Sequence, residues 1–121
     1  MAMKLNHLHV KTKDPDQTVK FYVEMLGATI FSRNAKGGYR LDLHGLAINV
    51  TKFNEGQKRE QQYGMEHLAI DTDDLDGVLA KVKEKGINIL EQTTGLGGRR
   101  VFFFEGPDGV QLEFIEVESA K

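Results

Sequence analysis

Two histidines and one glutamate in this sequence have the types and the spacing of a divalent-metal site. His7 and His67 each alternate with the apolar residues of a short strand pattern, and Glu113 does the same near the end of the chain. Successive side chains of a strand point to opposite faces, so these polar residues face away from their apolar neighbours. Two neutral imidazoles and a carboxylate leave open positions for water or substrate and suit Fe(II), Mn(II), Co(II), Ni(II) or Zn(II).

The segments that carry the histidines belong to an internal repeat. Residues 6–30 read NHLHVKTKDPDQTVKFYVEMLGATI, and residues 66–90 read EHLAIDTDDLDGVLAKVKEKGINIL. The two segments align with an offset of sixty residues, which places His7 on His67. Two copies indicate a duplicated half-domain.

The repeat also defines a fourth slot, at Asn49. Residues 47–50 (AINV) align with residues 111–114 (QLEF), so Asn49 corresponds to Glu113. Four polar side chains then fill equivalent slots, two in each copy, and the slots converge if the two half-sheets curl toward each other. A neutral amide is a poor metal ligand, so Asn49 is expected to bind weakly, to hold a metal-bound water or to contact substrate.

Each copy predicts the order strand–helix–strand–strand–strand and therefore an α+β fold. Asp14 and Asp74 are good helix N-caps, and Gly27 and Gly86 suit the helix ends. The expected later strands are Thr29–Arg33, Tyr39–Leu43, Leu46–Thr51, Asn88–Gln92, Arg100–Phe104 and Val110–Val117. We expect one domain over residues 1–121, made of module 1 (4–51), a polar linker (52–65) and module 2 (66–117).

Composition narrows the functional classes. The chain has 121 residues, a formal net charge of -2 and no basic stripe, which argues against a nucleic-acid partner. Its apolar runs are too short to span a bilayer, and its start has no apolar signal region, so a cytoplasmic location and no membrane partner are expected. The absence of cysteine excludes disulfides and thiolate ligands.

Several sequence segments together resemble one known superfamily. The segment Asn6–Val10, the pairs Phe21-Tyr22 and Leu26-Gly27, the segment Glu66–Ile70 and the closing run Gly106–Glu113 resemble the vicinal oxygen chelate superfamily. This superfamily includes glyoxalases, bleomycin resistance proteins and extradiol dioxygenases, and the resemblance covers nearly the whole chain. It implies two tandem βαβββ modules that form a curved mixed-sheet cup around one divalent metal per site.

The resemblance also implies ligands and a partner. Carried over by motif, His7, His67 and Glu113 are the metal ligands, and Glu113 is also a candidate for proton transfer. In members of this length two subunits often pair, so a homodimer with sites at the subunit interface is expected. Asn49 departs from the carboxylate that glyoxalase I usually has at its position, which puts standard glyoxalase I chemistry in doubt.

Other residues are candidates for catalysis or substrate binding. His9 shares a strand face with His7, so it is either an acid–base group or a structural residue bonded to a neighbour. Arg99 and Arg100 follow a glycine-rich segment that could close over a carboxylate-bearing substrate, although a surface hairpin fits them equally well. Phe103 and Tyr39 are candidates to line the cup, against the alternative that they only pack.

Three functions remain open on the sequence alone. The leading hypothesis is a metal-dependent enzyme that binds two adjacent oxygens of a small substrate and performs lyase- or isomerase-type Lewis-acid chemistry. The second is an Fe(II) extradiol-type dioxygenase that uses the same ligands. The third is a non-catalytic ligand-binding protein of the bleomycin-resistance type, which the presence of the metal ligands argues against.

Overall fold

The computed structural model describes residues 2–118, and these residues form two compact units. The N-unit comprises His7–Glu66. The C-unit combines the described parts of Met1–Asn6 and His67–Lys121. The first strand of the chain therefore begins in the C-unit and continues in the N-unit.

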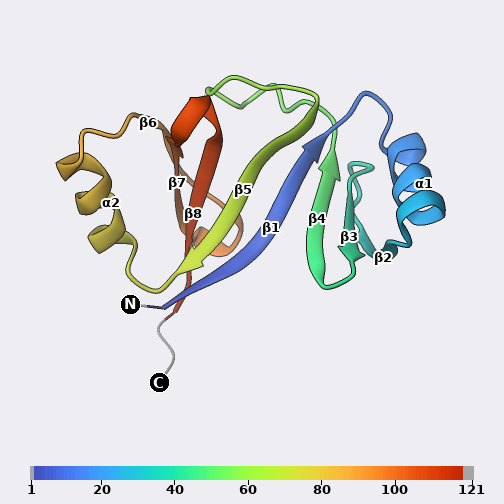
Figure 1. Ribbon diagram of the computed structural model, residues 1–121, viewed down its shortest axis with the longest axis horizontal. Helices are drawn as coiled ribbons and strands as arrows, with labels where there is room; N and C mark the ends of the chain where they lie inside the picture. The colour runs from blue at the N-terminus through green and yellow to red at the C-terminus, as the bar shows by residue number, and fades with distance from the viewer. Residues whose placement is uncertain (1, 119–121) are drawn as a thin grey trace. The chain divides into compact units, whose positions relative to one another are not determined.

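The N-unit contains one helix and a four-stranded mixed sheet (Figure 1). Its strand order is β2-β3-β4-β1, in which β1 runs parallel to β4 and the other neighbours are antiparallel. Its elements are β1 (Met3–Lys11), α1 (Pro15–Leu26), β2 (Thr29–Arg33), β3 (Tyr39–Leu43) and β4 (Leu46–Thr51).

The C-unit repeats this arrangement, with strand order β5-β8-β7-β6 and β5 parallel to β8 (Figure 1). Two short 3-10 turns, η1 (Leu96–Gly98) and η2 (Pro107–Gly109), precede its last two strands. Its main elements are β5 (Gly64–Thr72), α2 (Leu75–Glu84), β6 (Ile89–Thr94), β7 (Arg100–Glu105) and β8 (Gln111–Glu116).

Local sequence signals fix where the helices begin and end. The Asp14 side chain accepts a hydrogen bond from the backbone N–H of Gln17, and Asp74 does the same for Gly77. These bonds satisfy helix donors that have no partner within the helix. Gly27 ends α1 with a φ of 76°, in the left-handed region where glycine has no steric penalty.

Each helix packs on the apolar face of its own sheet. In the N-unit, Val19 of α1 packs in one cluster with Leu41 and Ile48, which are fully buried. In the C-unit, Val78 and Phe102 belong to the corresponding cluster. Strand residues of the opposite parity, which include all four predicted slots, therefore lie on the sheet face away from the helix.

The predicted α+β class and the repeated strand–helix–strand–strand–strand order are confirmed. The bounds of β2, β3 and β4 agree with the prediction, whereas β6 lies one residue later at its start and two at its end. Strand β5 already begins at Gly64, inside the segment expected to be a linker. Among residues 2–118, no helix is both long and apolar enough to cross a membrane.

Candidate metal and substrate site

In the C-unit, His67 and Glu113 form a close, buried pair. Strand β5 runs parallel to β8, and Ala69 lies opposite Glu113, so His67 and Glu113 project from the same sheet face. The distance from His67 Nε2 to Glu113 Oε1 is 3.1 Å. Only 3% of His67 and 8% of Glu113 is exposed.

The spacing of this pair fits two ligands of one metal ion. Two ligands that each lie about 2.1 Å from a divalent ion, at a right angle, are about 3 Å apart. The donor set, an imidazole nitrogen and a carboxylate oxygen, is one that several first-row divalent metals accept. The C-unit therefore brings together two of the three predicted ligands at a spacing that fits one ion.

Phe103 fixes the surroundings of this pair. It lies opposite Glu113 in the β7–β8 register, so it faces the same side of the sheet. Its ring meets the His67 ring edge-on, with centroids 5.2 Å apart and an interplanar angle of 88°. This contact limits rotation of the imidazole and keeps one side of it dry. Phe103 thus lies where a lining residue of the predicted site would lie.

In the N-unit, His7 and His9 lie on one face of β1. His7 is 7% exposed, and the two ring centroids are 5.7 Å apart. His9 Nε2 is 2.8 Å from the Thr51 hydroxyl oxygen on β4, so the two side chains share a hydrogen bond. This bond agrees with the structural role considered for His9, while its acid–base role stays a prediction.

Asn49 is hydrogen-bonded to Arg40, a residue that the sequence did not identify as part of the site. Arg40 lies opposite Asn49 in the β3–β4 register, and its Nη1 donates to Asn49 Oδ1 at 3.1 Å. The available signal was strand parity: Tyr39 and Leu41 pack toward α1, which turns Arg40 to the other face. In the folded chain, the side chain at this fourth position is therefore hydrogen-bonded to a guanidinium.

Tyr39 lies on the opposite face from Asn49. Its ring packs against the N-unit core, and its hydroxyl donates a hydrogen bond to the carboxylate of Asp16. That bond raises the pKa of Tyr39 above its usual value. The Arg33 guanidinium lies over the ring, 5.2 Å from its centroid. These contacts do not favour a substrate-binding role for Tyr39.

Arg100 also lies on the helix side of its sheet. Its guanidinium donates to Asp76, near the start of α2, at 2.9 Å and to Glu116 of β8 at 3.1 Å. These hydrogen bonds lower the pKa of both carboxyl groups below their usual values. The contacts tie β7 and β8 to α2 and do not place Arg100 beside Glu113.

Arg99 is exposed and lines a separate surface pocket of about 670 Å³ with the backbone of η1 and the acidic side chain of Glu116. Its substrate-binding role stays a prediction.

Comparisons with known proteins show the family to which this chain belongs. Residues 4–114 match the model of the glyoxalase/bleomycin resistance protein/dioxygenase superfamily. The chain belongs to this superfamily.

Similar proteins agree with the assignment. A lactoylglutathione lyase of Haemophilus influenzae is 30% identical, with 98% of this chain and 96% of that protein covered. YwkD of Bacillus subtilis is 32% identical, with 96% and 98% covered. A crystal structure of a hypothetical Bacillus halodurans protein has a TM-score of 0.75 at 21% identity, covering 100% and 99% of the two chains. Methylmalonyl-CoA epimerase of Mycobacterium tuberculosis has a TM-score of 0.70 at 19% identity, covering 96% and 88%.

The N-unit of this superfamily member also has a buried ionic network. Glu66, the residue before His67, is 2% exposed, and its carboxylate accepts a hydrogen bond from Arg59 at 3.0 Å. Lys11 is 3% exposed and donates to the side-chain oxygens of Gln57 and Gln61, each at 3.1 Å. Burial lowers the pKa of Lys11, while the nearby Glu66 carboxylate acts in the opposite direction. The segment that precedes β5 is therefore held by buried charges.

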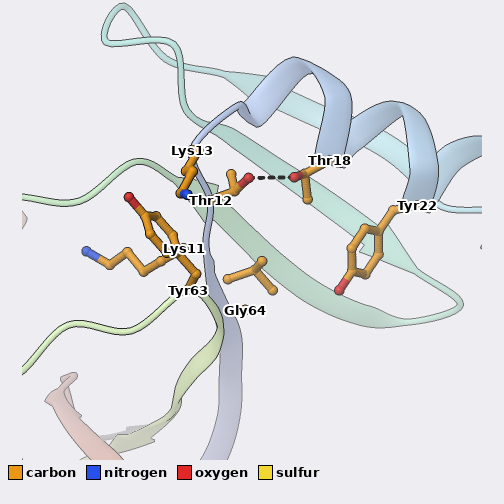
Figure 2. Close-up of a pocket in the computed structure, with 8 residues that line it drawn as sticks. Lys11, Thr12, Lys13, Thr18, Tyr22, Tyr63 and Gly64 are labelled. Atoms are coloured by element: carbon orange, nitrogen blue, oxygen red, sulfur yellow. Dashed lines mark hydrogen bonds between the residues drawn. The ribbon is translucent and has the colours of Figure 1, made fainter.

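A cavity of the N-unit lies beside the end of β1. It has a volume of about 500 Å³ and is lined by β1, α1 and the residues just before β5. Figure 2 shows the Thr12 and Thr18 hydroxyls bonded to each other, with the rings of Tyr22 and Tyr63 on either side. Of its lining residues, Val10 has the opposite parity to His7 and His9, whereas Lys11 has the same parity as the two histidines.

Proposed function

We propose that this superfamily member is a divalent-metal-dependent enzyme that acts on a small oxygenated substrate by lyase- or isomerase-type chemistry. His7, His67 and Glu113 hold the metal. The observation that carries the proposal is the buried pair of His67 Nε2 and Glu113 Oε1, 3.1 Å apart, a spacing that fits two ligands of one ion. The similar lactoylglutathione lyase supports the reaction class.

In the proposed reaction, the metal ion, Glu113 and Phe103 have separate roles. A divalent ion would supply Lewis-acid stabilisation of negative charge on two adjacent substrate oxygens. Glu113 has a second carboxylate oxygen, which accepts a proton from substrate carbon and returns it to the neighbouring atom. Phe103 excludes water from one side of His67, which strengthens electrostatic interactions within the site.

Metal analysis tests the proposal. Protein purified without chelator should contain close to one zinc, nickel, cobalt, manganese or iron ion per chain, and His67→Ala and Glu113→Gln should each abolish stoichiometric binding. His44→Ala is the matched control, because His44 bonds the carbonyl of Leu26 at the end of α1 and lies outside the ligand set. Wild-type protein that takes up no divalent ion would overturn the proposal.

The reaction is tested with the metal-loaded protein. Formation of S-lactoylglutathione from methylglyoxal and glutathione, and epimerisation of methylmalonyl-CoA, are the first two assays because similar proteins carry those names. Oxygen consumption with a catechol by the iron-loaded protein would instead indicate ring cleavage. Stabilisation by drug-like ligands but not by metals would indicate a binding protein.

We further propose that the protein is a homodimer in which each site takes His7 from one chain and His67 and Glu113 from the other. Mixing two inactive variants tests this. A dimer of one His7→Ala chain and one Glu113→Gln chain would hold both substitutions in one site and none in the other. Recovery of metal binding after mixing is expected, whereas sites built within one chain would show no recovery.

A further inference from the structure

Two large apolar side chains are exposed next to each other on α1. Phe21 is 57% exposed and Met25 is 68% exposed. They are four residues apart, so they are neighbours on one side of the helix. Residues 21–31 hold six of the twelve large hydrophobic side chains that are exposed within residues 2–118. Exposed apolar surface that gathers in one place marks an interaction site.

The duplicated helix α2 has the opposite character at the corresponding positions. With the offset of sixty residues, Phe21 and Met25 of α1 correspond to Lys81 and Lys85 of α2, and both lysines are exposed. The helix residues that pack on each sheet are mainly apolar in both copies. The fold that the two units share therefore does not require apolar residues at the exposed positions, whereas a protein partner would.

The exposed face of α1 formed by Lys20, Phe21, Glu24 and Met25 is complementary to itself. Lys20 and Glu24 are exposed and, like the apolar pair, are four residues apart. At about 100° per residue, the charged pair lies on one side of a line along the helix and the apolar pair on the other. A second α1 packed antiparallel along this line places Lys20 opposite the partner's Glu24, and Phe21 opposite the partner's Met25. The two pairs are centred at residues 22 and 23, so one two-fold axis serves both.

We propose that two copies of this chain associate through this face of α1, with the two helices antiparallel about a two-fold axis. A two-fold contact uses the same patch on both chains. Phenylalanine and methionine are enriched in protein interfaces, and the opposed charges set the register of the helices. His7 lies on the sheet face away from α1. The contact is therefore separate from the metal site, and any sharing of metal ligands between chains uses another surface.

Replacing the apolar pair with the lysines of α2 tests the contact. The double variant Phe21→Lys with Met25→Lys should fold, because α2 carries lysine at both corresponding positions, and circular dichroism checks this. Sedimentation equilibrium should show the wild type at twice the mass of the double variant. The dissociation constant of the contact should rise at least about tenfold, as it does when an interfacial hot spot is lost.

Charge reversal tests the antiparallel arrangement. Lys20→Glu makes both charges of the face acidic, and Glu24→Lys makes both basic. Like charges then oppose each other when either variant pairs with itself, so each alone should associate at least about tenfold more weakly. In an equimolar mixture opposite charges meet again, and the wild-type mass should return. Lys81→Glu is the matched control, because it makes the same change of charge at an exposed position of α2, and it should keep the wild-type mass.

The outcomes separate this contact from the proposed function. Equal masses for the wild type and the double lysine variant at every protein concentration overturn the contact. Two charge variants that stay dissociated when mixed, or a Lys81→Glu control that dissociates equally, also overturn it. Zinc content is the independent readout, and the α1 variants should bind zinc as the wild type does. A wild type that associates through α1 but takes up no divalent metal overturns the proposed function and leaves the contact standing.

Discussion

The buried ion pair between Arg59 and Glu66 gives the sharpest prediction about stability. Glu66→Gln keeps the shape of the side chain and removes its charge, which takes away the buried carboxylate that accepts from Arg59 and lies near Lys11. The side chain of Glu66 is 0% exposed and that of Arg59 is 7% exposed. Water therefore cannot replace the lost interaction.

The expected loss is large compared with the stability of a domain this size. Removing one partner of a buried pair costs about 3 to 5 kcal/mol. Total stabilities are about 5 to 15 kcal/mol, so the variant should lose roughly a fifth or more of its free energy of unfolding. The midpoint of thermal unfolding should fall by roughly 10 to 20 °C.

Urea unfolding followed by circular dichroism measures this loss. Asp76→Asn is the matched control, because it removes one charge from an ion pair whose side chains are 75% and 50% exposed. Exposed pairs contribute at most about 1 kcal/mol. The double variant Arg59→Met with Glu66→Gln should be more stable than Glu66→Gln alone. A loss for Glu66→Gln no larger than that of the control would refute the reasoning.

Three further predictions concern single residues. Burial lowers the pKa of Lys11 in the folded state, so the unfolded chain binds an extra proton just below pH 10.5. Urea titrations should therefore show that the wild type gains stability relative to Lys11→Met as the pH rises toward 10.5. The carboxyl partners of Arg100 have lowered pKa values, so the advantage of wild type over Arg100→Met should be present above pH 4.5 and should shrink on acidification below it. Gly27→Ala should lower the free energy of unfolding by about 1 to 2 kcal/mol, because the backbone at residue 27 is left-handed. Thermal unfolding should show a larger loss for Gly27→Ala than for Gly86→Ala, because only at Gly27 would the new carbon lie 3.3 Å from the His44 ring.

Regular elements could be predicted because their signals are local. Asp14, Asp74 and Gly27 act within one helical turn, and alternation along a strand sets which side chains face the helix. That alternation predicts that His67 and Glu113 lie on the sheet face away from the helix. Their spacing of 3.1 Å depends on the β5–β8 register. Pattern alone does not give such a register.

The missed residues depend on contacts between different segments of the chain. Arg40 had the parity of a site residue, but its bond to Asn49 requires the β3–β4 register. Residues 52–65 have a polar composition that predicts a linker, whereas Arg59 of this segment pairs with buried Glu66. Composition does not show which charges are buried together. Arg100 was a candidate for substrate binding for the same reason. Its partners Asp76 and Glu116 are distant in sequence, so the pattern does not show that they hold its guanidinium.

The division of the first strand between the two units has a consequence for synthesis on the ribosome. The N-unit, His7–Glu66, is continuous in the chain, so all of its residues are available before the rest has been translated. The C-unit needs its first residues from the start of the chain: Asn6 bonds Asp71 at 2.8 Å, and Ala2 bonds Asp73 at 2.7 Å. These partners of residues 2–6 become available only when the later half of the chain emerges. Vectorial synthesis therefore favours completion of the N-unit first. A nascent chain halted once Glu66 has left the ribosome should protect the N-unit strands from proteolysis while residues 2–6 stay accessible.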